Sequence, residues 1–338
     1  MTMKTKRYGI YFALAAALIL VLSWANIISG SSDVSTGEIL SILAGGGDKM
    51  HSNIIMNIRL PRTAAAFLLG GALALSGYLL QTFFANPIVG PFVLGISSSA
   101  KLAVAAAMIV FLSGGREIGL NMMVVSAFIG AVAAMMFVLA ISVKVRSMSV
   151  LVVCGIMIGY ICSAATDLAV TFADDSNIVN LHNWSMGSLS GVNWDEIRII
   201  TAMVIICMFL AVFIRKPMNA YRLGEAYAQS AGANILLLRV MLILISSLLA
   251  ATVTAFAGPI GFVGIAVPHL VRMCIRTDEA GVMVPASFLG GAAVTLLCDL
   301  IARCVFAPVE VSISSVTAVL LVPVVIYLMM KRGMKRES

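Results

Sequence analysis

Charged residues are scarce in this chain of 338 residues. Asp, Glu, Lys and Arg make up 11% of it, whereas hydrophobic residues make up 61%. An average soluble domain carries about 25% charged residues. A soluble fold of this length could not bury so much apolar surface. The scarcity of charge therefore excludes a water-soluble domain and predicts a protein that crosses a membrane several times.

Sequence motifs of enzymes and metal sites are also missing. The chain has no GxxxxGK[ST] loop, no HExxH pair and no GxSxG turn, which excludes ATP hydrolysis by this chain alone and argues against an intramembrane enzyme. The six cysteines have no CxxC or CxxH spacing, which is typical of small core residues. The histidines at 51, 182 and 269 have no ligand spacing either. We expect no catalytic residue, no metal site and no cofactor.

Ten apolar segments could each cross a bilayer, whose core needs about 20 residues of helix. The spans cover approximately residues 8–28, 62–84, 92–112, 120–142, 149–172, 197–214, 235–257, 260–274, 282–304 and 312–330. The apolar run after the basic N-terminus is too long for a signal peptide, so we expect a retained first helix. The predicted fold is an all-α polytopic membrane bundle of about ten transmembrane helices, including broken or short ones.

Basic residues lie in short segments between the apolar runs, so the net charge of +7 reports membrane orientation and not nucleic-acid binding. Ten spans place both termini on one side. If that side is the cytoplasm, the inside segments are mainly basic and the outside segments mainly acidic, as the positive-inside rule requires. Examples are Lys4, Arg7, Lys144, Lys216, Arg222 and Lys331 inside, and Asp48, Asp195 and Glu310 outside.

The stretch "GPIGFVGIAVPHLVR" (258–272) interrupts the apolar pattern with residues that weaken a helix. These are Gly258, Pro259, Gly261 and Pro268. Irregular backbone at membrane depth is tolerated only where it is buried in protein or lines a water-filled cavity. A similar stretch, "NPIVGPFVLGI" (86–96), lies five spans earlier and so has the opposite orientation, as in inverted-repeat transporters. We therefore expect the four residues to line a transport pathway.

Six motifs occur in one order along the chain. They are "RLPRTAAAFLLGGALALSGYLLQ" (59–81), "NPIVGPFVLGISSSA" (86–100), "NWSMGSLSGVNW" (183–194), "GEAYAQSAGAN" (224–234), "GPIGFVGIAVPHLVR" (258–272) and "CDLIAR...PVE" (298–310). In this the chain resembles the permease subunits of iron-chelate and cobalamin ABC importers, the FecCD-type permeases of type II importers. The resemblance implies one permease domain over residues 1–338, with ten spans, inside termini and a dimer with the pathway between subunits.

The resemblance gives a role to segment 216–234, the longest cytoplasmic loop, which we expect to hold a short amphipathic helix. In the family, the matching loop forms the coupling helices that dock on the ATPase subunit, and here glycines at 224 and 232 flank the expected helix. The residues that match its motif are Gly224, Glu225, Ala226, Gln229 and Gly232. The alternative interpretation is an ordinary helix at the membrane interface.

Three arginines, Arg59, Arg62 and Arg303, lie near the predicted outer ends of spans two and nine. In the family, matching arginines face acidic residues of the extracytoplasmic substrate-binding protein, where complementary charge steers docking. Arg59 and Arg62 could instead face lipid headgroups. Arg303 could pair with Asp299, four residues earlier on the same helix face. The outer loops are expected at about 29–58 and 173–196.

The resemblance also places a cytoplasmic gate, partly in the turn after span two and partly at the start of span five. The matching residues are Asn86, Pro87, Ile88, Met148 and Ser149. Asn86 could instead cap the start of a helix. Two ionisable residues fall inside spans: Asp167, which is expected to make a pathway or structural polar contact, and Lys101, which is expected to snorkel to the inner headgroups or to line the vestibule.

These features predict the membrane-spanning permease subunit of an ATP-driven importer of an iron chelate, a ferric siderophore or haem, in the bacterial plasma (inner) membrane. The expected partners are an ABC ATPase, an extracytoplasmic substrate-binding protein and a second permease subunit, identical or not. The alternatives are a cobalamin permease of the same family and an ion-coupled secondary transporter. The family's ELPVG and GAP patterns read "EVSIS" (310–314) and "LVP" (321–323) here, which leaves the hinge after span nine open.

Overall fold

The computed structural model describes residues 3–30, 34–113, 120–145, 147–173, 175–305, 307 and 309–334. Every regular element in these ranges is helical. Ten of the helices correspond to the ten predicted spans: α1 (Met3–Ile28), α4 (Leu60–Phe83), α5 (Ile96–Ser113), α6 (Leu120–Lys144), α7 (Met148–Thr171), α9 (Trp194–Phe213), α12 (Ile235–Ala257), α13 (Val263–Ile275), α14 (Ala280–Cys304) and α15 (Ile313–Met334).

The apolar helices divide by length. Seven are long and apolar enough to cross a membrane by themselves. The other three apolar stretches are shorter: Ile96–Val110, Val263–Ile275 and Ile313–Tyr327. Together they confirm the all-α polytopic bundle with short helices that the sequence predicts.

Short helices occupy the connections between the spans. They are α2 (Thr36–Leu43), α3 (Lys49–Ile54), the π-helix η1 (Ile55–Arg59), the 3₁₀-helix η2 (Pro91–Leu94), α8 (Asp175–Ser185), α10 (Arg215–Arg222) and α11 (Glu225–Ser230). α3, η1 and α4 run on without a break from Lys49 to Phe83, so this helix begins well before the predicted start at residue 62.

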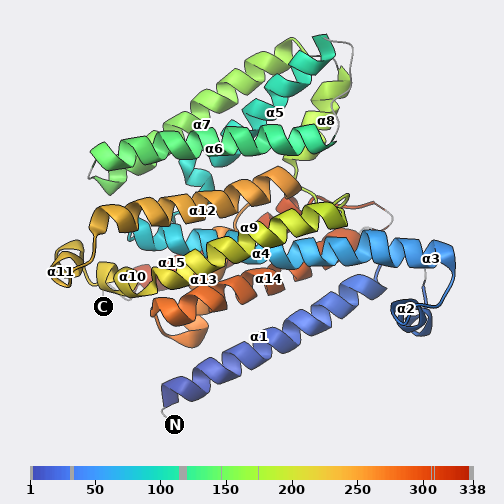
Figure 1. The fold of residues 1–338 in the computed structure, drawn as a ribbon, viewed down its shortest axis with the longest axis horizontal. Coiled ribbons are helices and arrows are strands. Elements are labelled where there is room, and N and C mark those ends of the chain that lie inside the picture. The colour runs from blue at the N-terminus through green and yellow to red at the C-terminus, as the bar shows by residue number, and fades with distance from the viewer. Residues whose placement is uncertain are drawn as a thin grey trace.

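α4 is the central helix, with 83% of its apolar window buried inside the protein. It packs against α12, α13 and α14, and α1 covers the far side of α14 (Figure 1). Close approach needs small residues, because bulky side chains would hold the backbones apart. A Cβ added to Gly77 would lie only 1.7 Å from the backbone oxygen of Gly264 in α13. The glycine-rich sequence of α4 therefore fixes where α13 lies.

The helices α5, α6 and α7 form a second group, which joins the rest of the bundle where α6 packs on α12 (Figure 1). α7 is the least covered long helix, with 17% of its apolar window buried. Its exposed face includes Tyr160 and Ile161, at 68% and 69% exposure. This large apolar face is available to lipid or to another protein chain.

Both chain ends lie at one end of the bundle, together with α10 and α11, while α2, α3 and α8 lie at the opposite end (Figure 1). This arrangement agrees with ten spans and termini on one side. We refer to the two ends as cytoplasmic and outer.

The cytoplasmic loop contains the expected short helix between Gly224 and Gly232, which is α11, and a second short helix before it, α10. Gly224 separates α10 from α11 with φ +127°, and Gly232 follows α11 with φ +82°. L-residues with a side chain rarely adopt such angles. The glycines of the motif therefore set the two corners of this helical pair.

Candidate gate and coupling site

Residues that the sequence assigns to the gate and to the coupling loop line one cavity at the cytoplasmic end. The cavity has a volume of about 460 Å³. Asn86, Pro87 and Met148 contribute from the gate set, and Gly224 and Glu225 from the coupling set. The two sets are more than 70 positions apart in sequence, so only the packing of α4, α7 and α10 brings them together.

The other members of the two sets lie outside the wall of this cavity. Ile88 is 53% exposed, and Ala226, Gln229 and Gly232 are exposed on and after α11. Ser149 is exposed beside the half-buried Met148 at the start of α7. The exposed part of α11 is therefore free to contact a cytosolic surface.

The cavity wall is basic. It contains three arginines: Arg222, Arg239 and Arg272. Among the described residues of the wall, Glu225 is the only acid. Arg239 donates to Glu225 at 2.7 Å, which ties α11 to the start of α12. Guanidinium–carboxylate pairs of this kind bind two elements together while leaving the wall with excess positive charge.

Asp278 joins two of these arginines. It lies in the connection between α13 and α14, where its carboxylate pairs with Arg222 of α10 at 2.8 Å and with Arg272 of α13. Burial acts to raise the pKa of Asp278, but the two arginines together outweigh that effect and lower the pKa. The carboxylate therefore stays ionised and links the coupling loop to the broken helix.

A second link runs from the coupling loop to the gate turn. The hydroxyl of Tyr221 in α10 donates to the backbone oxygen of Phe83, the last residue of α4, at 3.3 Å. The gate turn follows directly. Ala85 adopts φ +48°, which is unfavourable for a residue with a Cβ. The side chain of Asn86 accepts from the backbone N–H of Ile88 at 3.0 Å, so it stabilises the turn and does not cap a helix.

The helix break predicted at 258–272 is present. α12 ends at Ala257, Gly258 has φ +71°, and α13 begins only at Val263, after Phe262 with φ +66°. With 13 residues, α13 is about 20 Å long, which is less than the hydrocarbon thickness of about 30 Å. α13 is therefore too short to cross the hydrocarbon by itself, as expected of a helix that follows a break.

Other segments satisfy the backbone groups that this break exposes. The oxygen of Ala257 accepts from the backbone N–H of Ser188 at 2.8 Å. The oxygen of Pro259 accepts from the hydroxyl of Ser314 at 2.6 Å. Ser314 belongs to the "EVSIS" stretch that departs from the family pattern, so this departure supplies a bond that holds the start of α15 to the break.

Pro268 lies inside α13 and has no N–H for the carbonyl of Gly264. The side-chain amide of Gln81 in α4 points to this carbonyl, with its nitrogen 3.4 Å from the oxygen of Gly264 and 3.1 Å from that of Ile265. A buried carbonyl without a donor costs free energy, and Gln81 offsets that cost. Gln81 also lines the cytoplasmic cavity, so one side chain serves both the broken helix and the gate region.

The two glycine–proline stretches that resemble each other in sequence also touch in space. A Cβ on Gly264 would lie 3.0 Å from Pro91 in η2, and a Cβ on Gly90 would lie 2.6 Å from Ile265. Both stretches therefore lie side by side against α4, in the interior of the bundle.

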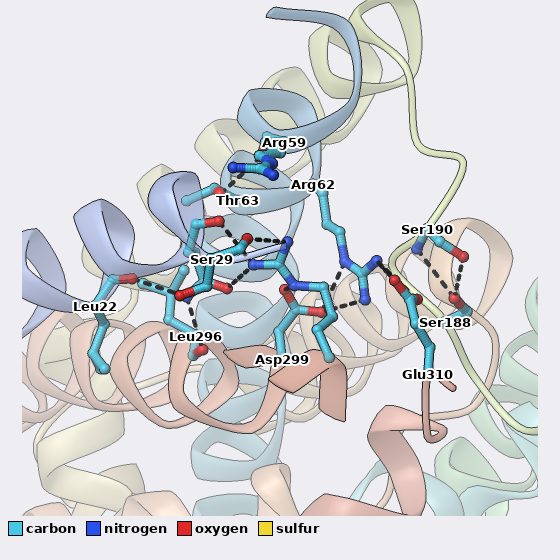
Figure 2. Close-up of polar contacts among 12 residues, drawn as sticks. Leu22, Ser29, Arg59, Arg62, Thr63, Ser188, Ser190, Leu296, Asp299 and Glu310 are labelled. Carbon is cyan, nitrogen blue, oxygen red and sulfur yellow. Dashed lines mark hydrogen bonds and ion pairs between the residues drawn. The ribbon is translucent and has the colours of Figure 1, made fainter. Parts of the chain in front are cut away.

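An ionic cluster holds the outer end of the bundle. Figure 2 shows Arg62 of α4 between Asp299 of α14 and Glu310. Its Nε donates to Asp299 at 3.0 Å, and one terminal nitrogen donates to both oxygens of Glu310 at 3.0 and 2.9 Å. The side chains of Arg62 and Asp299 are 8% and 1% exposed. Asp299 also lies 3.5 Å from Arg303, which confirms the intrahelical pair that the sequence offered as one interpretation.

The remaining outer contacts fasten α1. Arg303 donates to the backbone oxygen and to the side chain of Asn26, at 2.8 Å each. Arg59 donates to the oxygens of Ile27 and Ile28 at 2.8 and 2.7 Å. These carbonyls belong to the last turn of α1, which has no intrahelical donors for them. The arginines therefore cap a helix and join α1, α4 and α14.

The docking prediction for Arg59, Arg62 and Arg303 assumed that they face outward. They are buried, at 3%, 7% and 9% exposure, and each already has acceptors within the protein. The headgroup-facing alternative for Arg59 and Arg62 is wrong for the same reason. An arginine in a largely apolar setting must keep an acceptor, and here the end of α1 and two carboxylates provide them.

The two ionisable residues inside spans are placed differently. Asp167 is exposed on α7, the least covered long helix, and Lys101 is half-buried on α5. The sequence assigned no site role to the polar residues that connect the gate and coupling sets. They are Gln81, Tyr221, Arg222, Arg239 and Asp278. A glutamine within an apolar span was the one available signal, because a polar residue there usually has a specific partner.

Comparison with known proteins agrees with this architecture. The sequence model of the FecCD transport family matches residues 18–331. The vitamin B12 import system permease BtuC of Salmonella arizonae is 33% identical, with 93% of this chain and 92% of that protein covered. A protein of Methanocaldococcus jannaschii described as an ABC transporter permease is 32% identical over 97% of this chain and 96% of its own length.

Similarity extends to solved structures. An inward-facing transporter described as of metal-chelate type matches with a TM-score of 0.84 and 27% sequence identity, covering 96% of this chain and 99% of that one. The family match covers most of the chain, and the helices from α2 to α14, the break and the cytoplasmic loop all fall within it. The chain therefore belongs to the FecCD transport family and is a multi-pass ABC permease of the plasma membrane.

Proposed function

We propose that this permease imports an iron chelate, a ferric siderophore or haem, and that the cytoplasmic cavity converts ATPase movement into opening of the gate. The observation that carries the coupling proposal is the shared cavity, in which gate residues such as Asn86 and coupling residues such as Glu225 form one wall. A push on α10 and α11 reaches the gate turn through Tyr221 and reaches α13 through Asp278. Such rigid-body transfer suits alternating access around a fixed pathway.

Membership of the family implies partners. The chain lacks a phosphate-binding loop, so ATP hydrolysis belongs to a separate ATPase subunit, and the exposed residues of α11 are our candidates for its docking surface. A substrate-binding protein would dock at the outer end. Docking on Arg62 would require Glu310, which is half-exposed, to release it.

The proposed substrate class follows from the positive charge of the cavity wall. Many ferric chelates are anionic, and three arginines line the cavity beside the gate while Lys101 lies in α5. An electropositive wall favours anions. Cobalamin is the second candidate, because the Salmonella arizonae relative is named as a vitamin B12 permease.

The substrate test is uptake into proteoliposomes that contain the permease, its ATPase and its binding protein. Radiolabelled ferric siderophore, haem and cobalamin are supplied separately, with ATP inside. We expect uptake of one iron chelate. Uptake of cobalamin alone would overturn the substrate proposal and leave the coupling proposal standing.

The coupling test uses Glu225→Lys, which reverses the charge beside Arg239, and Gly232→Pro, which cannot adopt φ +82°. We expect both variants to lose ATP-driven uptake. A matched control is Gly37→Ala at the outer end, where a Cβ would meet nothing within 4 Å. Normal uptake by both coupling variants would show that α11 does not couple ATP hydrolysis to transport.

A further inference from the structure

A groove on the outer half of the bundle is unrelated to the gate and the ionic clusters. It lies between α6, α9 and α12 and has a volume of about 530 Å³. Its wall is mainly apolar: Val124, Val125, Phe128, Ile129, Ile199, Met203 and Phe256. From Asp195 to Met203 the groove follows α9 for about 12 Å. An apolar lining and a volume of this size suit part of an acyl chain.

The outer end of the groove is polar and acidic. Asp195 and Glu196 from the first turn of α9 line it, and none of the described residues in its wall is basic. Glu196 is held in place, since it accepts from the backbone N–H of Asn193 at 3.0 Å in a capping box. The nearby Arg198 pairs with Asp195 at 2.8 Å, but both side chains are about four-fifths exposed, with values of 79% and 85%. An ion pair between such exposed side chains is weak, so another cation can compete with Arg198 for the carboxylate of Asp195.

The same end also offers hydrogen-bond donors. Asn121 lies in the first turn of α6, and its side chain is exposed at the groove. Amide groups and the free N–H groups of a helix start are suitable partners for phosphate oxygens. The groove therefore combines an apolar channel with a donor and two carboxylates at its outer end.

We propose that this groove binds a membrane phospholipid with a primary ammonium headgroup, of the phosphatidylethanolamine type. One acyl chain lies between α6 and α9. The phosphate meets Asn121, and the ammonium meets Asp195 and Glu196. The headgroup requirement follows from charge complementarity, because an anionic glycerol headgroup would face two carboxylates without a basic residue in the wall.

The test is native mass spectrometry of the delipidated full-length chain, titrated with phosphatidylethanolamine, phosphatidylcholine or phosphatidylglycerol of identical acyl chains. We expect phosphatidylethanolamine to bind about fivefold more tightly, which is about 1 kcal/mol at 1.4 kcal/mol per tenfold. The double variant Asp195→Asn/Glu196→Gln should lose this preference. It should keep its fold, because Gln at this position can still complete the capping box.

Two tryptophan variants locate the site. Met203→Trp fills the groove and should remove the preferred lipid. Ile205→Trp, on the same helix but outside the groove and 61% exposed, should not. Equal binding of the three lipids, or full retention of the preference by Met203→Trp, would refute the proposal. So would a loss of two-chain complexes in Met203→Trp, which would make the groove a contact between copies.

Discussion

The two ionic clusters of this permease are built from similar residues but differ in burial. In the outer cluster, the side chains of Arg62, Asp299 and Arg303 are between 1% and 8% exposed, and only Glu310 at its edge is half-exposed, at 49%. In the cytoplasmic cluster, the two carboxylates that hold the arginines, Asp278 and Glu225, are 55% and 50% exposed. A buried ion pair is costly to break, whereas an exposed pair contributes little and can open readily.

The difference matches what each cluster connects. The outer cluster joins α1, α4 and α14, three long helices that pack along their lengths. The cytoplasmic cluster joins short elements: α10, α11, the broken helix α13 and the start of α12. We infer that the outer cluster fixes the frame and that the cytoplasmic cluster transmits movement. The predictions that follow test this division, from the largest expected effect on stability to the smallest.

Asp299→Asn should destabilise the protein most. The substitution leaves Arg62 and Arg303 buried without their shared carboxylate, which costs about 3–5 kcal/mol. The measurement is the free energy of unfolding in detergent. Glu310→Gln is the control, because Glu310 is half-exposed and its loss should cost less than about 1 kcal/mol. An equal fall in the free energy of unfolding for the two variants would contradict a buried outer frame.

Gly77→Ala should push α13 away from α4, because the new Cβ would lie 1.7 Å from the oxygen of Gly264. Overpacking of this kind costs about 1–3 kcal/mol. Gly9→Ala in α1 is the matched control, since a Cβ there meets nothing within 4 Å. Thermal unfolding of the two variants in one detergent gives the comparison. If Gly77→Ala unfolds at the wild-type temperature, the close packing of α4 on α13 is not required.

Gln81→Leu should cost about 1–2 kcal/mol, because the carbonyls of Gly264 and Ile265 would lose their side-chain donor inside the membrane. Uptake should fall as well, since the same side chain lines the cavity beside the gate. Gln229→Leu, on the exposed side of α11, serves as the control for stability. A normal unfolding free energy in Gln81→Leu would show that water supplies the missing donor.

Asp278→Asn should change stability by less than about 1 kcal/mol and yet lower ATP-driven uptake about tenfold, because it removes the carboxylate charge that pairs with both Arg222 of α10 and Arg272 of α13. ATP hydrolysis by the assembled transporter should persist. Arg276→Gln, an exposed neighbour, is the control. A parallel fall in stability and uptake would mean that the cytoplasmic cluster is structural, like the outer one.

The contribution of Asp278 to the free energy of unfolding should not change between pH 8 and pH 5. Burial raises its pKa, but Arg222 and Arg272 lower it by more, so the folded-state pKa lies below the ordinary value. A carboxyl group whose pKa is lowered by folding stabilises the folded state at pH values above its unfolded-state pKa. This stabilisation is lost as the pH falls through the folded-state pKa. The difference in unfolding free energy between the wild-type chain and Asp278→Asn should therefore stay constant over this range. A step near pH 6 would contradict ionisation of Asp278 by its two arginines.

The sequence by itself determined the class of the protein. Scarce charge and ten apolar runs predicted the spans, and glycine and proline at 258–272 predicted the broken helix, because backbone geometry is set locally by residue type. The motif order predicted the family. Local patterns cannot show which distant side chains meet, however. α11 was therefore predicted between its two glycines but α10 was not, and the outer arginines were predicted as exposed.

Only the tertiary structure decided the partners. Gln81 and Gly264 are 183 positions apart, and Arg62 and Asp299 are 237 apart, so no spacing rule relates them. In a membrane bundle each buried polar group must find a partner within the protein, since lipid offers none. The packing of α4 against α13 and α14 determines which partner that is, and so brings scattered residues together in the proposed gate and coupling site and in a buried outer cluster.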